Sequence, residues 1–555
     1  MARRVLVSLV VCSALLVAVP ARAAAHAGDA KLDAVLRQRA HLPAGISQVI
    51  VRTRDGQPAT LRIRAIGGVP GRQLASLGGQ VARIPNSALH RLAAFSDVSS
   101  VSLDRPVHGT LERGEPTAAA VGARWVTEQL GFDGTGVGIA LIDSGVSAWH
   151  DDLEPGRVVH FADFLNYRPT LYDDYGHGTH VAGIIAGSGL SSEGARRGIA
   201  PGAHLVVLKA LDGAGGGYIS NVIAAIDYAI AIRDTYNVRI INLSVSAGVY
   251  ESYETDPLTL AAKRAVDAGL VVVAAAGNLG RTADGQPQSG GIAAPGNAPW
   301  VLTVGASSHK GTIDRRDDEV AAFSSRGPAV IDGSAKPDLV APGVAIQSLA
   351  EPSSVLFTAH PDDRLWGVLD SISEPYLSLS GTSMAAPVVA ATAALMLEAN
   401  PSLTPNAVKA ILQFTAEARP DYDHHTQGAG FLNARGAVEL SRSFEEPAKT
   451  RNLASKTDDP VRWSRQLIWG NHQVRGGMLT ARANAWDPDV VWGASLTPSG
   501  EAVVWGTQCP STQAPCSSSP WTVETAHRTR DAGRFEPPAL PVVRNGWPAD
   551  PARFH

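Results

Sequence analysis

Four polar residues stand at the ends of segments that read as strands or helices, where their side chains could act together. They are Asp143, His177, Asn278 and Ser383. A serine becomes a nucleophile when a base accepts its proton and a carboxylate orients that base. An asparagine amide can donate to the negative charge that develops on an oxygen. Together, these residue types predict acyl transfer.

Each of these residues also has a structural interpretation. Ser383 lies in LSLSGTSMAAPVVA, directly before an Ala-rich apolar run. Serine is favoured as the N-cap of a helix, an aspartate before glycine forms turns, and a buried asparagine is satisfied by loop backbone. We expect Ser383 to cap a helix whose positive dipole end and backbone N–H also favour an oxyanion.

His177 and His180 lie in DYGHGTHVAGIIAG, at the start of a helical segment. Their spacing could suggest a metal pair, but the i, i+4 spacing and the intervening Glu of a metalloprotease helix are missing. The glycines that flank His177 favour the close approach of a backbone or substrate. An imidazole also suits a base that works near neutral pH. We therefore predict a base at His177 and no metal ligands.

The elements that must position these residues alternate between strands and helices from 136 to about 440. Continuous apolar runs, typical of strands covered on both faces, are VGIALID, HLVVLKAL, RIINLSV, LVVVAAAGN and PWVLTVGAS. Segments of helical composition between them cover 179–186, 219–233 and 258–268. This alternation predicts an α/β fold with a parallel sheet and helices on both faces. The site is then expected where loops leave the carboxyl ends of the strands.

The length of 555 residues predicts several domains. A net charge of −4 gives no basic surface for nucleic acid or an anionic membrane.

Arg3 and Arg4 precede an apolar run, 5–19, and small-residue sites at 21–23 and 25–27, which is typical of a secretory signal. The run is shorter than the roughly 20 residues of a membrane span. We expect cleavage and export, with a lipid anchor at Cys12 as the weaker alternative.

The two ends of the remaining chain differ from its middle. Residues 28–110 contain strand patterns at 47–53 and 98–103 and a helix at 87–95 that Asn86 could cap, which predicts a small α+β unit. Residues 441–555 repeat a Trp-Gly pattern at Trp469, Trp492 and Trp505, which favours a short β-rich appendage over a solenoid. In an exported chain, CPSTQAPC predicts a disulfide between Cys509 and Cys516 rather than a metal site.

Seven motifs occur in one order along the middle of the chain: IALIDSGV, HGTHVAGIIAG, INLSVS, VVVAAAGN, FSSRGP, KPDLVAPG and LSGTSMAAPVVA. Together they resemble the subtilisin-like serine proteases, the subtilase family or peptidase family S8, over roughly 125–440. The chain order Asp, His, Ser is that of subtilisin, whereas α/β-hydrolases have the order Ser, Asp, His.

The resemblance implies a subtilisin-like three-layer α/β domain, with a parallel sheet and helices on both faces. A ferredoxin-like α+β propeptide is expected before it and a small β-rich extension after it. The implied domains are a signal peptide at 1–27, an inhibitor-like propeptide at 28–110, a linker at 111–124, the catalytic domain at 125–445 and a Trp-Gly-containing extension at 446–555.

The resemblance also assigns roles to single residues. Asp143 would orient His177, which acts as base and then acid, while Ser383 attacks the scissile carbonyl. Asn278 and the backbone N–H of Ser383 would form the oxyanion hole, and His180 would be structural. The implied walls of the pocket for the side chain before the cut are Ser244, Val245, Ser246, Ala275, Ala276, Gly277 and Ala293. These small walls predict a roomy apolar pocket, and Ser246 departs from the glycine that the family often has there.

The implied function is a secreted, monomeric serine endopeptidase that cuts protein or peptide substrates with broad, apolar preference. It would be made as a precursor, inhibited by its own propeptide until it cuts itself between Arg105 and Ala119. No cofactor is implied for catalysis, and a structural calcium ion is allowed because Asp152 matches an acidic ligand position. The alternatives are a non-catalytic peptide-binding relative, and a polymer-binding role of the Trp-Gly extension.

Overall fold

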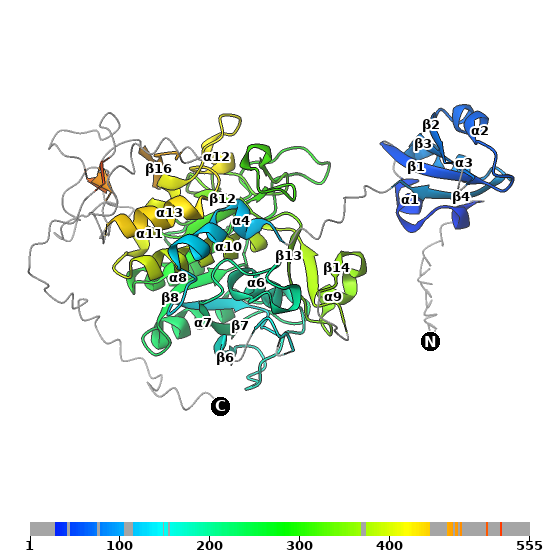
Figure 1. The fold of residues 1–555 in the computed structure, drawn as a ribbon. Coiled ribbons are helices and arrows are strands. Elements are labelled where there is room, and N and C mark those ends of the chain that lie inside the picture. The colour runs from blue at the N-terminus through cyan, green and yellow to red at the C-terminus, as the bar shows by residue number, and fades with distance from the viewer. Residues whose placement is uncertain are drawn as a thin grey trace, which may run out of the picture. The chain divides into compact units, whose positions relative to one another are not determined.

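The computed structural model describes residues 28–41, 45–74, 78–104, 115–147, 149–153, 156–367, 373–444, 463–469, 472–474, 478–479, 507–508 and 522–523. The expected signal peptide, the Cys509–Cys516 pair, Trp492 and Trp505 lie outside these residues. The chain divides into two compact units, Met1–Leu111 and Glu112–His555 (Figure 1).

The first unit is a four-stranded antiparallel sheet with helices between its strands (Figure 1). Its elements are α1 (Ala34–Arg39), β1 (Ile46–Thr53), α2 (Thr60–Ala65), β2 (Val69–Leu74), β3 (Gly79–Pro85), α3 (Leu89–Ala93) and β4 (Val98–Leu103). The strand order is β2-β3-β1-β4, and the chain order from β1 to β4 is β-α-β-β-α-β, which is ferredoxin-like. Buried and outward side chains alternate along β1, so the helices cover one face of the sheet over a core of its own.

The expected Asn86-capped helix over 87–95 is wrong in detail. A 3₁₀ turn covers Asn86–Ala88, its N-cap is Pro85, and α3 follows only at Leu89. The side chain of Asn86 instead accepts a hydrogen bond of 2.8 Å from the hydroxyl of Ser47. Asn86 is buried against β1, and this tertiary partner replaces the local cap.

The second unit is built on an eight-stranded sheet whose core strands are parallel. The strands are β5 (Gly138–Asp143), β6 (Val158–Asp163), β7 (His204–Lys209), β8 (Val238–Leu243), β9 (Val271–Ala275), β10 (Leu302–Ser308), β11 (Glu319–Val320) and β12 (Leu339–Pro342). Their order is β11-β10-β9-β8-β5-β7-β6, with β12 also on β10, and only the β10·β11 pair is antiparallel. Every residue of β5 and β9 is buried, which confirms a sheet covered on both faces.

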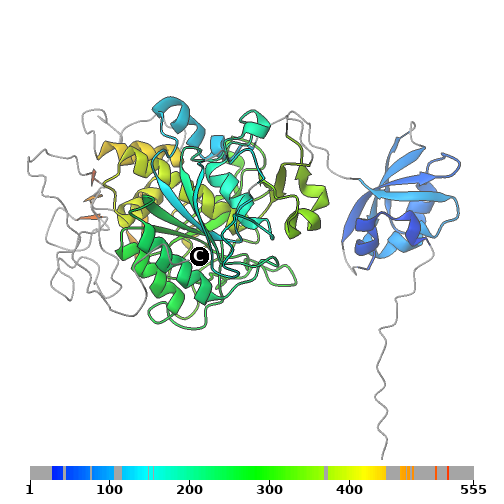
Figure 2. The same ribbon diagram turned by 90° about the horizontal axis from the view of Figure 1, so that it is seen from below.

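Two groups of helices cover the two faces of this sheet, as the two views show (Figures 1 and 2). On one face, α6 (His177–Ala186), α10 (Thr382–Ala399), α11 (Pro405–Thr415) and α13 (Ala434–Ser443) share a core with the sheet. On the other, α7 (Ile219–Ile232) and α8 (Pro257–Asp267) form a second core. The α/β fold class predicted from the sequence is thereby confirmed.

Smaller elements complete the second unit. The short helices are α4 (Thr117–Ala120), α5 (Ala123–Trp125), α9 (Val355–Ala359) and α12 (His424–Gln427). A small sheet contains β13 (Ile346–Leu349), β15 (Tyr376–Leu379) and β14 (Arg364–Leu365). In the last part of the chain, the described strands are β16 (Leu467–Trp469), β17 (His472–Val474), β18 (Met478–Leu479), β19 (Thr507–Gln508) and β20 (Thr522–Val523).

Helix α10 lies at the centre of the larger core. Among the described helices, only α10 is long and apolar enough to cross a membrane, yet 89% of it is buried inside the protein. Such burial is typical of the core helix of a folded domain. Its packing against α6, α13 and the strands β8, β9 and β10 explains its apolar composition.

The first described residues of the second unit are fastened by Glu115, a carboxylate that is only 6% exposed. One of its oxygens accepts hydrogen bonds from the N–H and the hydroxyl of Thr117, at 3.1 and 2.6 Å, and lies 3.3 Å from Nε2 of His309. The other accepts the N–H of Gln347 in β13 at 2.6 Å. Burial alone would raise the pKa of Glu115. Its partners, His309 above all, outweigh burial and hold the pKa of this carboxyl below its ordinary value.

Two buried lysines share one buried aspartate between β10, β12 and α11. The ammonium groups of Lys336 and Lys409 each lie 2.9 Å from one carboxylate oxygen of Asp338. Backbone carbonyls of Pro299 and Val301 accept further hydrogen bonds from them, at 2.6–3.1 Å. Burial and the neighbouring charge of Lys409 lower the pKa of Lys336 to about 7, although Asp338 opposes that shift.

We predict that the free energy of unfolding rises with pH above neutrality because of Lys336. In the unfolded chain a lysine keeps its proton up to about pH 10.4, whereas folded Lys336 loses it from about pH 7. Since the unfolded state binds more protons in this window, stability increases with pH by up to about 1.4 kcal/mol per unit. The contribution is fully present above the unfolded pKa and is lost as the pH falls towards the folded pKa.

Urea unfolding between pH 7 and about pH 10 measures this effect, with Ser383→Ala in every protein to prevent self-digestion. Lys336→Met should flatten the rise, whereas Lys263→Met, at a partly exposed lysine on α8, should keep it. Equal slopes in the two variants would show that Lys336 is not the titrating group.

Candidate active site

Strand register brings two of the predicted residues to the same edge of the sheet. Ile142 and Leu243 are direct partners across the parallel pair β5·β8, so the residues that follow them, Asp143 and Ser244, leave their strands at one level. Strand β9, the other neighbour of β8, ends at Ala275, three residues before Asn278. Parallel strands thus deliver three chain segments to their common carboxyl edge.

Asp143 and His177 form a buried hydrogen-bonded pair. The Nδ1–H of His177 donates to Oδ1 of Asp143 at 2.8 Å, and the imidazole is 14% exposed while the carboxylate is fully buried. Burial lowers the pKa of His177, but the charge and hydrogen bond of Asp143 outweigh it, and the pKa lies above its ordinary value. This bond also fixes the tautomer, because a proton on Nδ1 leaves Nε2 free to act as a base.

The turn that carries His177 is held by Asp173, which sequence reasoning did not single out. Asp173 is buried, and its carboxylate accepts from Ser144 Oγ at 2.8 Å, Gly176 N at 2.7 Å, Thr179 N at 2.8 Å and Thr179 Oγ1 at 2.6 Å. It therefore joins the loop after Asp143 to the first turn of α6. Asp173 lies three residues before the N-cap Gly176, where capping rules give no signal, and its contact with Ser144 joins two distant segments.

The glycines beside His177 allow two backbones to meet. A Cβ on Gly178 would collide with the carbonyl oxygen of Gly145, and Gly145 itself has φ +110°, where side chains are rarely accommodated. The close approach is thus between the loop after β5 and helix α6. This intramolecular contact accounts for the glycine at 178 without a bound substrate.

Ser383 occupies the second position of α10, and the expectation that it caps the helix is wrong. The N-cap is Gly381, and no side chain caps this helix end. The hydroxyl of Ser383 instead donates to the backbone carbonyl of Ser244 at 2.9 Å. Within the described residues, no hydrogen bond joins Ser383 to His177. The residue is half-buried at the start of a largely buried helix.

Asn278 is exposed, and its amide is oriented by the residue before Ser383. Its Oδ1 accepts from both the N–H and the hydroxyl of Thr382, each at 3.0 Å. Its Nδ2 lies on the side of Gly381, where an added Cβ would come within 3.5 Å of it. Because the oxygen is engaged, the N–H₂ group is the end that can serve a ligand.

His180 lies one turn beyond His177 and faces the core. Its ring is buried, and its Nε2–H donates to the carbonyls of Leu377 at 2.9 Å and Ile346 at 3.1 Å. Burial is the main reason that its pKa falls to about 4, so the ring is neutral. It ties α6 to β13 and β15.

The residues expected to line the specificity pocket lie at the carboxyl ends of the adjacent strands β8 and β9, except Ala293, which lies in the segment before β10. Ser244, Ala275 and Ala276 are buried, Val245 and Ala293 are half-buried, and Ser246 is exposed. The Ala276 carbonyl accepts the N–H of Ala293 at 3.0 Å, and Ala247 exchanges two hydrogen bonds with Ala294. The structure therefore brings the 275–277 and 293 segments into contact beside 244–247.

The surroundings of Asp152 do not fit the calcium site that the sequence allowed. One carboxylate oxygen accepts the Ser191 N–H and the other the Tyr376 hydroxyl, both at 2.7 Å. The guanidinium of Arg196 lies 4.7 Å from the centre of the Tyr376 ring. A calcium ion needs several free oxygen ligands, whereas these oxygens face hydrogen-bond donors and a nearby cation. Among the described residues, no cluster of His, Cys, Asp and Glu could hold a metal.

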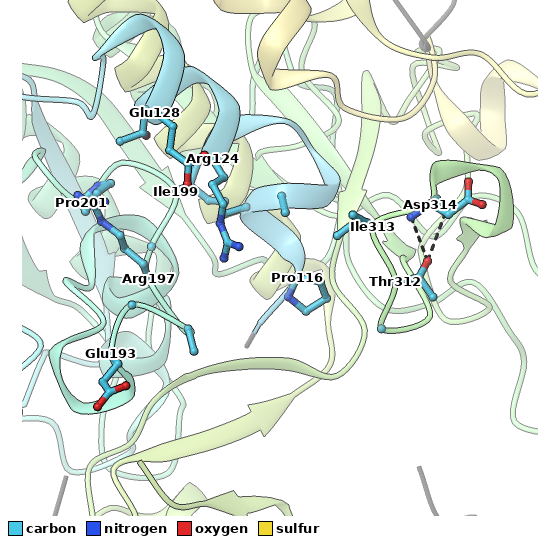
Figure 3. Close-up of a pocket in the computed structure, with 17 residues that line it drawn as sticks. Pro116, Arg124, Glu128, Glu193, Arg197, Ile199, Pro201, Thr312, Ile313 and Asp314 are labelled. Atoms are coloured by element: carbon cyan, nitrogen blue, oxygen red, sulfur yellow. Dashed lines mark hydrogen bonds between the residues drawn. The ribbon is translucent and has the colours of Figure 1, made fainter. Parts of the chain in front are cut away.

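A separate cavity of about 780 Å³ lies among the segments 116–128, 193–201 and 311–314. Figure 3 shows the charged side chains of Arg124, Glu128, Glu193, Arg197 and Asp314 around it. Its lining contains none of the predicted site residues. This cavity is therefore distinct from the candidate site at the edge of the sheet.

Sequence comparisons with known proteins agree on one family. The sequence model of the Subtilase family matches residues 134–431. The serine protease AprX of Bacillus subtilis (strain 168) is 39% identical over 363 residues, covering 64% of this chain and 78% of that protein. Subtilisin E of the same organism is 29% identical over 374 residues, 67% of this chain and 84% of that protein. A solved structure, a cold adapted subtilisin-like serine proteinase, is 30% identical, covers 53% of this chain and 88% of its own, and gives a TM-score of 0.40.

We predict that Asp143→Asn lowers the pKa of His177 below the ordinary value of about 6.5. The substitution removes the negative charge that raises this pKa and replaces the carboxylate acceptor with a weaker amide, but it leaves the imidazole buried. A nitrogen-15 NMR titration of the histidine rings, in a Ser383→Ala background, measures the shift. Asp227→Asn, at an exposed ion pair on α7, serves as control and should leave the titration unchanged. An unaltered His177 titration in Asp143→Asn would contradict the assigned cause.

Proposed function

The chain belongs to the subtilase family and is a serine-type endopeptidase, and on that premise we propose that Asp143, His177 and Ser383 are its catalytic triad. The observation that carries the proposal is the 2.8 Å bond between His177 and buried Asp143. Ser383 supports it from a third element, because its contact with Ser244 lies at the strand edge that Asp143 shares.

In the proposed reaction, Oγ of Ser383 attacks the scissile carbonyl carbon while Nε2 of His177 takes its proton. The hydroxyl must first leave the Ser244 carbonyl, where it donates in the resting structure. Asp143 stabilises the imidazolium, which then protonates the departing amine. Water hydrolyses the acyl-enzyme in a second attack, again with His177 as base. These steps require no cofactor.

The oxyanion of the tetrahedral intermediate would receive two hydrogen bonds. One comes from Nδ2 of Asn278, whose oxygen is occupied by Thr382. The other comes from the backbone N–H of Ser383 in the first turn of α10, where the helix dipole favours negative charge. A donor that is already oriented needs no reorganisation when the charge develops.

We further propose that the pocket for the residue before the cut is formed by 244–246, 275–277 and Ala293. The small side chains of Ala275, Ala276 and Ala293 support a broad preference for apolar residues. The exposed hydroxyl of Ser246 would meet the substrate, and it replaces the glycine that the sequence resemblance leads one to expect. We expect the Ser246 side chain to narrow the range of residues that the enzyme accepts before the cut.

The precursor is proposed to be exported by residues 1–27 and to carry 28–110 as an intramolecular inhibitor. The separate core of the ferredoxin-like unit supports this assignment, because a unit with its own core can be cut away as a piece. Residues 111–124 would be the linker, 125–445 the catalytic domain of a monomeric enzyme, and 446–555 the extension. Export rests on the signal pattern of the sequence.

Ser383→Ala is expected to abolish both maturation and covalent labelling. The alanine keeps the helix but removes the nucleophile, so residues 28–110 should stay attached and a fluorophosphonate probe should not react. Gel analysis of the expressed precursor, with and without the probe, measures both. Ser380→Ala, which removes a neighbouring exposed serine, is the matched control and should mature and label normally. Labelling that survives Ser383→Ala would exclude Ser383 as the nucleophile.

Asn278→Ala is expected to lower kcat by about 100- to 1,000-fold with little change in KM, the loss that subtilisin shows without one oxyanion donor. The ground-state substrate carries no oxyanion, so binding should be spared. Steady-state kinetics on a chromogenic peptide, normalised by active-site titration, separates the two constants. A rise in KM at constant kcat would mean that Asn278 contacts the substrate rather than the transition state.

A further inference from the structure

Helix α10 contains a proline one turn after Ser383. In an α-helix the N–H of residue i+4 donates to the carbonyl of residue i, and proline has no N–H. Pro387 therefore removes the donor that would satisfy the backbone carbonyl of Ser383. A polar group that is partly withdrawn from water needs a replacement partner.

Ser244 supplies that partner from outside the helix. Its hydroxyl donates to the carbonyl of Ser383 at 2.8 Å, and the hydroxyl of Ser383 donates in return to the carbonyl of Ser244 at 2.9 Å. The two residues thus exchange a reciprocal pair of bonds. Ser244 is only 4% exposed, so neighbouring protein atoms rather than water surround its hydroxyl.

Asn242 determines where the hydroxyl of Ser244 points. Its Nδ2 donates to Oγ of Ser244 at 2.9 Å, so the single hydroxyl proton of Ser244 is committed to the Ser383 carbonyl. Asn242 is fully buried in β8, between register partners Leu141 of β5 and Val273 of β9. Its Oδ1 has no hydrogen-bond partner among the described residues, so the side-chain hydrogen bond that Asn242 makes there is the one to Ser244.

We propose that Asn242 and Ser244 are positioning residues that hold the nucleophile by replacing the helical hydrogen bond lost at Pro387. The central sheet, rather than the helix, then fixes the backbone carbonyl of Ser383 and, through the backbone, the place of the Cβ that carries the hydroxyl. The proposal rests on the proposed function, in which Ser383 is the nucleophile. It also gives Ser244 a role distinct from that of a pocket wall.

A double-mutant cycle between Ser244 and Pro387 tests this exchange of donors. Ser244→Ala leaves the Ser383 carbonyl without a donor and should lower kcat about 10-fold at nearly constant KM. Pro387→Ala restores a backbone N–H at the position that helix geometry prescribes, so the double variant should recover much of the kcat lost in Ser244→Ala. Ser244→Thr keeps the hydroxyl donor and should therefore lose less kcat than Ser244→Ala.

Thr392 provides the matched control within the same helix. Its hydroxyl also donates to a helix carbonyl, that of Val388, at 2.8 Å, but Val388 lies outside the proposed machinery. Thr392→Ala should leave kcat unchanged and show no coupling to Pro387→Ala. All rates are normalised by fluorophosphonate titration, and thermal unfolding of each variant verifies the fold.

The outcomes separate the proposal from the function on which it rests. A rise in KM at constant kcat in Ser244→Ala, or a lowered kcat that Pro387→Ala does not restore in a folded enzyme, would overturn the positioning role alone. Full activity in Ser383→Ala, run in the same panel, would overturn the proposed nucleophile and the positioning role with it.

Discussion

The parallel register of β5 and β8 is the constraint on which the candidate active site depends. Because Ile142 and Leu243 are partners, the carboxylate of Asp143 and the backbone of Ser244 emerge side by side. A slip of one residue would turn Asp143 to the opposite face of the sheet. The helices add the remaining groups, since the turn before α6 is tied to this edge through Asp173 and Ser144, and α10 through Ser244.

The pKa values of buried groups in the second unit depend on two opposing effects, desolvation and the charge of neighbouring groups. At His177 the carboxylate of Asp143 outweighs burial, and the imidazole gains affinity for protons. At Lys336 burial outweighs the carboxylate of Asp338, because a second lysine shares it. The same two effects therefore raise the pKa of His177 and lower that of Lys336. The difference is that one carboxylate serves one cation at His177 but two cations at Lys336.

Sequence patterns predicted the sheet of the second unit because fully buried parallel strands leave long apolar runs, as in β5 and β9. They missed β6, whose residues are mostly half-exposed and lack such a run. Helix-capping rules gave wrong predictions where a side chain binds a residue distant in the sequence. Asn86 accepts a hydrogen bond from Ser47 rather than capping a helix, and Ser383 donates to the carbonyl of Ser244. The contacts of Asp173 with Ser144 and of Ser244 with Ser383 join distant segments, which spacing along the chain does not reveal.

The anchoring of Glu115 bears on how such an enzyme survives among its own copies. Proteases attack chain ends and loops that can be drawn out into an extended form. Here the carboxylate of Glu115 binds Thr117 and β13 from within the protein. A cut upstream of this residue leaves a new amino end that is fastened a few residues later, so little loose chain is offered to a neighbouring molecule. This fastening would limit proteolysis of one copy of the enzyme by another at this end of the folded unit.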